Sequence, residues 1–185
     1  ILSTGIEVHT GVRIGEDISF EQLEDQFDAI YISIGAQNDK KIGIPGEEST
    51  GVLSAVELLR AVGSGHAPDF TGKKVVVIGG GNVSMDATRT ARRLGAASVT
   101  WMYRRRVEDM TALAEEIEEA AAEGCEIMPL QAPVAIEANE QGQVCAIVTR
   151  PQQIGAVGKD GRPRPINAGG EDLHTPCDIV IVAIG

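Results

Sequence analysis

The alternation of apolar and polar positions predicts a chain of strands and helices. Residues 73–78 open with two lysines and continue as an unbroken apolar run, which is typical of a strand buried on both faces. Three glycines follow, then a predicted helix over about residues 82–94 and a second strand over residues 98–104. Strand, helix and strand in this order predict a βαβ unit in a parallel sheet.

The amino-terminal residues predict two strands and a short helix. Residues 6–14 alternate apolar and polar positions, and residues 28–36 form an apolar run that ends in Gly35 and Ala36. Between them, Ser19 and Gln22 have the spacing of a capping box, in which each residue's side chain caps a backbone N–H of the other. A short helix is therefore expected to begin after Ser19.

Residues 38–72 are expected to form a linker and a helix. The linker, over about residues 38–51, is rich in glycine and proline. The helix is expected to follow Ser54, because Ser54 and Glu57 also have capping-box spacing. Gly63 lies where a carboxyl-terminal cap glycine is expected.

The carboxyl-terminal half predicts one long helix and several short strands. The helix is expected from about Asp109 to Glu123, with Gly124 ending it. Strand candidates follow at residues 125–130, 132–138 and 144–150, with a ragged hairpin over residues 154–172 and a buried strand over residues 177–185. Together these elements predict an α/β fold. We expect a Rossmann-like, doubly wound domain over residues 73–185, with a βαβ dinucleotide unit and a small antiparallel β meander.

Composition narrows the class of function. Of the 185 residues, 43% are hydrophobic, which is enough for a packed core, and the formal net charge is -11. This charge disfavours nucleic acids and anionic membranes as partners. No apolar run is long enough to span a bilayer, and no secretory signal is visible. A chain that begins without Met is expected to be part of a longer protein.

The cysteines predict no metal site. Cys125, Cys145 and Cys177 stand far apart, and the chain contains no CxxC motif. Isolated, buried thiols are expected, which suits a cytoplasmic protein.

The glycines after the first βαβ strand predict a dinucleotide site. Gly79 and Gly81 match the first two glycines of G-x-G-x-x-G, and the small residue Ser84 takes the third position. The first glycine permits a tight turn, and the second lets the backbone approach a pyrophosphate. The helix amino terminus would then face the phosphates, with Asn82 expected as its cap. A glycine-rich turn without a ligand is the alternative. The residues of the predicted motif are Gly79, Gly80, Gly81, Asn82, Val83 and Ser84.

The end of the second βαβ strand predicts which dinucleotide is bound. NAD-specific sites carry an acidic residue here, whereas this strand ends in Arg104, Arg105 and Arg106. Guanidinium groups suit the 2′-phosphate of NADP(H), so Arg104 and Arg105 are expected to bind it. The alternative is that the arginines pair with Glu108, Asp109 or the acidic helix that follows. We expect Arg106 to do so.

The chain resembles a known family. The segments GIPGE, GVLSAVELL, GGGNVSMDATRTARRLGA, YRRRVEDMTALAEEIEEA and DIVIVAIG are similar to the pyridine-nucleotide region of the NADPH-dependent glutamate synthase small-subunit family. The resemblance implies a two-dinucleotide flavoprotein that passes a hydride from NADPH to FAD. Electrons would then reach an iron–sulfur subunit or a glutamate synthase large subunit.

The resemblance also implies FAD contacts at both ends of the chain. Residues 1–37 would be the edge of an FAD-binding domain, with the Val12 backbone near the adenine and Gly35–Ala36 as a first crossover. The last strand would cross back to that domain, through Ala183, Ile184 and Gly185. The FAD fingerprint itself is absent, so the isolated chain is expected to lack flavin and to be inactive.

Two acidic residues are further cofactor-binding candidates by the same resemblance. Asp86 would face the nicotinamide, or would only complement the dipole of its helix. Glu116 would reach the adenosine end of NADP, or would belong to a solvated acidic face, which is the favoured interpretation. No catalytic side chain is expected, because flavin and nicotinamide carry the hydride chemistry. The alternative function is a non-catalytic module that senses the NADPH/NADP ratio.

Overall fold

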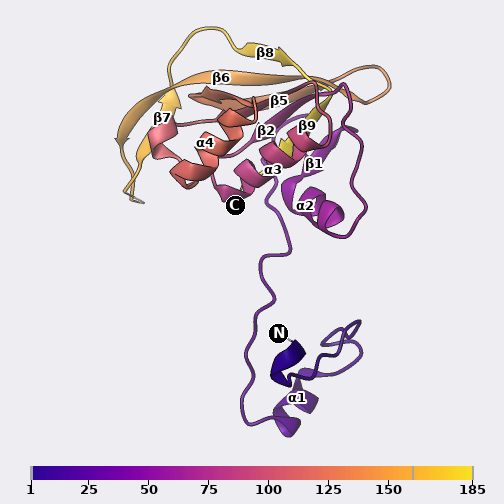
Figure 1. Cartoon of the computed structure of the whole chain (residues 1–185). Helices are drawn as coiled ribbons and strands as arrows, with labels where there is room; N and C mark the ends of the chain where they lie inside the picture. The colour runs from indigo at the N-terminus through magenta and orange to yellow at the C-terminus, as the bar shows by residue number, and fades with distance from the viewer. Residues whose placement is uncertain (1, 160, 185) are drawn as a thin grey trace. The chain divides into compact units, whose positions relative to one another are not determined.

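The structure is a computed structural model, and it describes residues 2–159 and 161–184. The chain divides into two compact units, Ile1–Ala36 and Gln37–Gly185, and each is described by itself. Figure 1 shows both, with the first unit in indigo and violet.

The first unit contains little regular structure. It has a short 3₁₀ helix, Leu2–Thr4, and helix α1, Phe20–Gln26. The predicted capping box is confirmed, because the Gln22 N–H donates to Ser19 Oγ at 3.2 Å and the Ser19 N–H donates to Gln22 Oε1 at 2.8 Å. The strands predicted over residues 6–14 and 28–36 are wrong. Apart from one isolated bridge between Ile14 and Ile18, the described residues there pair with no strand, and a strand needs a hydrogen-bonded neighbour.

A five-stranded parallel sheet forms the centre of the second unit. Its strands lie in the order β1-β9-β2-β3-β4, and every neighbouring pair is parallel. The predicted βαβ unit is confirmed as β2–α3–β3, in which Val77 of β2 lies between Trp101 of β3 and Ile181 of β9. The strand bounds are β1 Val52–Ser54, β2 Lys74–Ile78, β3 Ser98–Tyr103, β4 Glu126–Pro129 and β9 Ile179–Val182.

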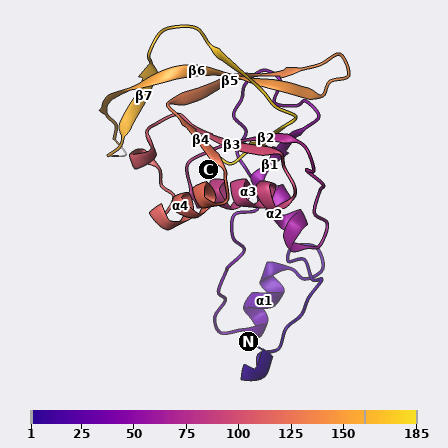
Figure 2. The same cartoon turned by 45° about the horizontal axis from the view of Figure 1, so that its top comes forward.

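Three helices cover one face of this sheet (Figure 2): α2 Ala55–Gly63, α3 Asn82–Arg93 and α4 Ala114–Ala122. The α3 side chains Met85, Ala87 and Ala91 are fully buried against the sheet, in one cluster with Trp101. Burial of this apolar face is what holds the helix on the sheet.

An antiparallel sheet covers the opposite face (Figure 2). Strand β6 lies between β5 and β7 and also pairs with β8. Ile136 and Ile147 pack from it onto Val76, Ile78 and Met102 of the parallel sheet. The predicted α/β class and antiparallel meander are thus confirmed, and this meander takes the place of a second helical layer. The bounds are β5 Gln131–Ala138, β6 Val144–Val157, β7 Pro163–Asn167 and β8 Leu173–Pro176.

Two predicted helix boundaries are wrong. Helix α2 does begin after Ser54, whose Oγ accepts from the Glu57 N–H at 3.2 Å, but it includes Gly63 and is capped at Ser64. The glycine with left-handed backbone is Gly65, at φ +78°. The helix expected from Asp109 begins only at Ala114, after a 3₁₀ turn Val107–Asp109 and a non-helical segment, residues 110–113.

Candidate functional site

The glycine turn lies at the carboxyl edge of the parallel sheet. Gly79 directly follows β2, and its N–H donates to Met102 O of β3 at 3.1 Å. On the other side, the Ala183 N–H at the end of β9 donates to Ile78 O at 2.9 Å. The chain runs from β2 outward through β3 and β4, whereas β9 and β1 lie on the opposite side of β2. Ligands of open α/β sheets bind at such a reversal of strand order.

Two of the three glycines are required by the protein's own packing. A Cβ at Gly79, which has φ +156°, would lie 2.4 Å from Ala183 O and 2.9 Å from Ser84 Cβ. A Cβ at Gly80 would lie 2.4–2.8 Å from three ring carbons of Tyr103. Both separations are far below van der Waals contact. Gly79 therefore allows the end of β2 to pack closely against Ala183 and the start of α3, and Gly80 leaves room for the Tyr103 ring.

The packing of the protein does not require the third glycine, Gly81. Gly81 has φ -106° and ψ 177°, a backbone conformation that any residue adopts. Within the described residues, a Cβ there would meet only Thr111 Oγ1, at an ordinary contact distance of 3.4 Å. Neither conformation nor packing explains a glycine at this position. A ligand that approaches the backbone closely would explain it, so the turn fits the pyrophosphate of a dinucleotide.

Helix α3 begins at this turn. Gly81 is its N-cap, and no side chain caps it. Among the described residues, the N–H groups of Asn82 and Val83 find no acceptor, and both residues are exposed. They are available to an anion, as is usual at a helix amino terminus. Ser84 is fully buried, and its Oγ donates to Gly81 O at 2.6 Å, which fixes the turn against the helix.

Asn82 does not have the capping role expected from the sequence. It is the first residue of α3, and its Oδ1 accepts from the Leu113 N–H at 2.9 Å. The N–H groups of Thr111 and Ala112 both donate to Gly80 O, at 2.9 and 3.0 Å. Residues 110–113 are thus held on the glycine turn. Sequence periodicity gives no signal for this contact, because it joins residues about 30 positions apart.

The three arginines after β3 differ in environment. Arg104 is exposed, and its guanidinium makes no hydrogen bond or ion pair with the rest of the described chain, whereas Arg105 is only 7% exposed. Arg106 donates to both carboxylate oxygens of Asp109, at 2.9 and 3.1 Å, so its predicted pairing is confirmed. This hydrogen bond holds the pKa of Asp109 below its usual range. Of the two arginines expected at the rim, only Arg104 is exposed.

Asp86 and Glu116 lie on neighbouring helices but are not alike. Asp86 is exposed on α3. Glu116 of α4 accepts from Arg89 of α3 at 3.0 Å, and Glu123 accepts from the same guanidinium at 2.8 Å. Hydrogen bonds from Arg93 and Arg89 hold the pKa of Glu123 below its usual range. Glu116 is therefore part of an ion-pair network between the two helices and not of a solvated acidic face.

The expected FAD contacts are divided between the two units. Ala183 and Ile184 follow β9 beside the glycine turn, and Gly185 lies outside the described residues. Val12, Gly35 and Ala36 belong to the first unit, where all three are exposed. Their relation to the glycine turn stays a prediction.

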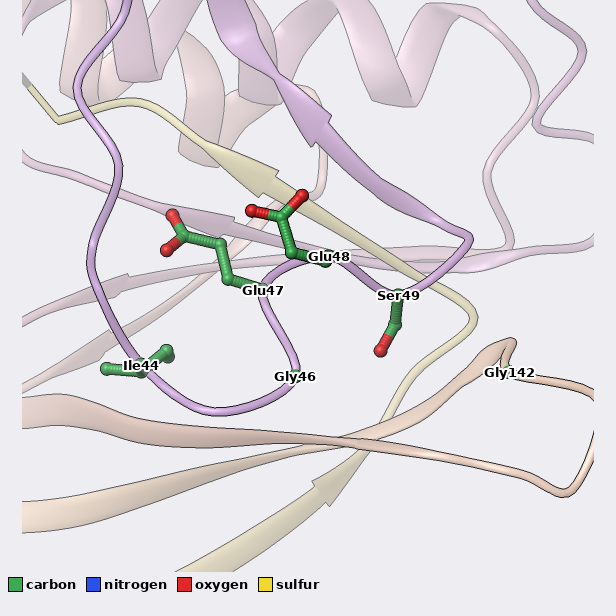
Figure 3. A pocket seen from close by; sticks show the side chains of 6 residues that line it. All are labelled: Ile44, Gly46, Glu47, Glu48, Ser49 and Gly142. Atoms are coloured by element: carbon green, nitrogen blue, oxygen red, sulfur yellow. The ribbon is translucent and has the colours of Figure 1, made fainter.

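A separate hollow lies beside the linker (Figure 3). Ile44, residues 46–49 and Gly142 line it, and none of them belongs to the glycine turn. The Glu47 carboxylate accepts from the Ile42 and Gly43 N–H groups at 2.6 and 2.8 Å, and Glu48 pairs with Lys41. These carboxylates thus stabilise the fold of the linker.

The remaining chemistry of the described chain is limited. Cys125 and Cys177 are buried, and burial raises the pKa of the Cys177 thiol to about 12. Cys145 is exposed, so the expectation that all three thiols are buried is wrong. The described residues contain no cluster of metal-ligating side chains. They also contain no helix with the length and apolarity needed to cross a membrane.

The comparison with known protein families identifies the chain. A family model described as pyridine nucleotide-disulphide oxidoreductase matches residues 3–185. The chain belongs to this family. FAD and NADP(H) are the cofactors expected from the sequence, and they are those of the family and its relatives.

Curated relatives confirm the resemblance found in the sequence. The glutamate synthase [NADPH] small chain of Halomonas elongata is 35% identical over 98% of this chain and 40% of its own length. The NADP(+)-dependent formate dehydrogenase subunit beta of Moorella thermoacetica is 36% identical over 100% of this chain and 26% of its own length. The putative oxidoreductase AegA of Escherichia coli K12 is 36% identical over 98% and 29%. The chain thus spans less than half of these relatives.

Solved structures confirm the fold. Mycobacterium tuberculosis FprA in complex with NADPH superposes with a TM-score of 0.76 over 94% of this chain and 53% of FprA, at 22% identity. Lactococcus lactis thioredoxin reductase has a TM-score of 0.59 over 80% of this chain and 42% of its own, also at 22% identity.

Proposed function

We propose that this chain is the NADP(H)-binding part of an FAD-dependent oxidoreductase, in which a hydride passes from NADPH to FAD. The observation that carries the proposal is Gly81. Its lack of a side chain serves neither backbone conformation nor packing, and it lies at the carboxyl edge of the sheet, where α3 begins. A diphosphate held against this backbone accounts for the glycine.

Each part of the site has a separate task in this proposal. The N–H groups of Asn82 and Val83 and the positive end of α3 hold the diphosphate. Arg104 binds the 2′-phosphate, since its guanidinium, after the end of β3, is exposed and has no partner among the described residues. When bound, nicotinamide and flavin supply the hydride chemistry, so the chain's residues bind and orient.

The remaining parts of the machinery lie beyond this chain in the proposal. The rest of the flavoprotein provides the FAD fingerprint, and an iron–sulfur subunit or a glutamate synthase large subunit accepts the electrons. Two relatives support this arrangement by name, since one is a subunit beta and another a small chain. The isolated chain is accordingly expected to bind NADP(H) without oxidising it.

Titration of NADP⁺ into the purified chain and its Gly81→Val variant tests the proposal. The valine side chain would occupy the space of the diphosphate, so affinity is expected to fall on the order of 100-fold or more. Gly63→Val is the matched control, because Gly63 also has no left-handed backbone, and no described atom outside its chain neighbours and its own helix backbone lies within 4 Å of its Cβ position. Urea unfolding checks that both variants are folded. Equal affinities of wild type and Gly81→Val would refute the proposed site.

A further inference from the structure

A hydroxyl group lies over the open side of the glycine turn. Apart from Gly81 itself and its two chain neighbours, Thr111 Oγ1 is the one heavy atom of the described chain within 4 Å of the Cβ position of Gly81, at 3.4 Å. Thr111 is exposed, and it comes from the segment between the 3₁₀ turn and α4, not from the G-x-G-x-x motif. The side that Gly81 leaves free for a ligand is therefore the side on which this hydroxyl lies.

The Thr111 hydroxyl donates only a long, weak hydrogen bond within the described chain. Its one hydrogen bond runs to Gly80 O at 3.4 Å, whereas O–H···O bonds normally measure about 2.5–3.0 Å. The Gly80 carbonyl is already well occupied, since the Thr111 and Ala112 N–H groups donate to it at 2.9 and 3.0 Å. The hydroxyl could therefore donate instead to a better acceptor beside Gly81, with little loss of hydrogen-bond free energy within the protein.

The position of Thr111 is nevertheless fixed by the turn itself. Its own N–H and that of Ala112 are bound to Gly80, and the Leu113 N–H is bound to Asn82 Oδ1 at 2.9 Å. On the other side, the buried Tyr103 hydroxyl donates to Asp109 O at 3.0 Å. Contacts on both sides thus hold the backbone of Thr111 in place before any ligand arrives, as an efficient binding group requires.

We propose that Thr111 is a further ligand of the dinucleotide diphosphate, to which its hydroxyl donates a hydrogen bond beside Gly81. This role rests on the proposed function, and it extends the site beyond the glycine motif and the arginines. The diphosphate is then held from two elements, by the amino terminus of α3 and by the segment before α4. Thr111 thereby recognises the diphosphate, which NADP(H) and ADP share, and not the 2′-phosphate.

Three ligands separate these contributions in calorimetric titrations. NADP⁺ carries both groups, ADP carries only the diphosphate, and 2′-AMP carries only the 2′-phosphate. Thr111→Val removes the hydroxyl at nearly constant volume, and Thr111→Ser keeps it. A hydrogen bond to a charged group predicts about tenfold weaker binding of NADP⁺ and ADP to Thr111→Val, at the lower end of the range because the residue is exposed. Binding of 2′-AMP should be unchanged, and Thr111→Ser should bind all three like the wild type.

The outcomes separate this inference from the proposed function. Failure of the wild type to bind NADP⁺ would overturn both. Wild-type binding with unchanged NADP⁺ and ADP affinities in Thr111→Val would overturn the role of Thr111 alone. An equal loss for 2′-AMP, or a loss in Thr111→Ser as large as in Thr111→Val, would also overturn it, because the effect would then come from a changed turn. Thermal unfolding of each variant checks that it is folded.

Discussion

Replacement of Arg104 by alanine should reduce the preference for NADP(H) over NAD(H). The two ligands differ by one phosphate, and Arg104 is the guanidinium that the structure leaves exposed and without a partner in the described chain. Arg106 is committed to Asp109, with two hydrogen bonds of 2.9 and 3.1 Å. Arg105 is 7% exposed, so it offers little surface for direct contact with a ligand.

The expected preference for NADP(H) over NAD(H) is calculated from one arginine in direct contact with the 2′-phosphate rather than two. A charge-assisted hydrogen bond contributes roughly 1.5–3 kcal/mol, and exposure to solvent favours the lower end, near 1.5–2 kcal/mol. This corresponds to a preference of about 10- to 30-fold. Two arginines at the rim would have given a few hundred-fold, so burial of Arg105 lowers the expectation by roughly a factor of ten.

The assay is titration of wild type, Arg104→Ala and Arg164→Ala with NADP⁺ and NAD⁺ at two salt concentrations. Arg164 is a charge-matched control, because it is exposed on β7 in the antiparallel sheet. Arg104→Ala should weaken NADP⁺ alone, and added salt should shrink the wild-type preference, since the contact is ionic. Equal wild-type affinities, or equal losses for both nucleotides in Arg104→Ala, would refute the assignment.

Two further predictions concern the turn and its support. Gly79→Ala should lower stability by about 3 kcal/mol, because its Cβ would lie 2.4 Å from a backbone oxygen, and should lower the melting temperature by about 6–12 °C; a melting temperature within 1–2 °C of wild type would contradict this packing. Asp109→Asn should be less stable than wild type at neutral pH, with a difference that shrinks below pH 3.8. The folded-state pKa of Asp109 is depressed from 3.8, so its contribution is present above that value and is lost as the pH falls through the folded pKa. Urea unfolding at pH 7, 5 and 3 measures this difference, and a constant difference would contradict the role of the Arg106 pair.

The βαβ unit and its glycine motif could be predicted because their signals are local. An unbroken apolar run gave β2, and the glycines gave the turn and the start of α3. The motif could not show that a Cβ at Gly79 would clash with Ala183 and one at Gly80 with Tyr103, whereas a Cβ at Gly81 would clash with neither. These neighbours come from other strands, so only the folded chain distinguishes packing glycines from a binding glycine.

The parts of the site that sequence reasoning missed depend on contacts between distant segments. Thr111 belongs to no sequence motif and lies in a stretch predicted to be helical. It lies at the glycine turn because its own N–H and that of Ala112 donate to Gly80 O. Charge and position alone do not separate Arg104 from Arg105, since alternation after β3 decides which side chain is buried. Glu116 likewise lies within reach of Arg89 only because α3 and α4 pack side by side.

Two segments with the same pattern show most directly what local sequence leaves undecided. Residues 28–36 and 177–185 both open with an aspartate or a cysteine–aspartate pair and continue through an apolar run to Ile-Gly. The second forms β9, which pairs with β1 on one side and β2 on the other, and Val180 and Ile181 are fully buried. The first forms no strand, and Tyr31 and Ile34 are 92% and 74% exposed. A strand is stabilised by pairing with other strands and by burial of its faces. The apolar pattern therefore marks a segment that could form a buried strand, but it does not show whether other strands lie beside that segment. The strand prediction succeeded for β9, which β1 and β2 pair with and help to bury, and it failed for residues 28–36, which form no strand.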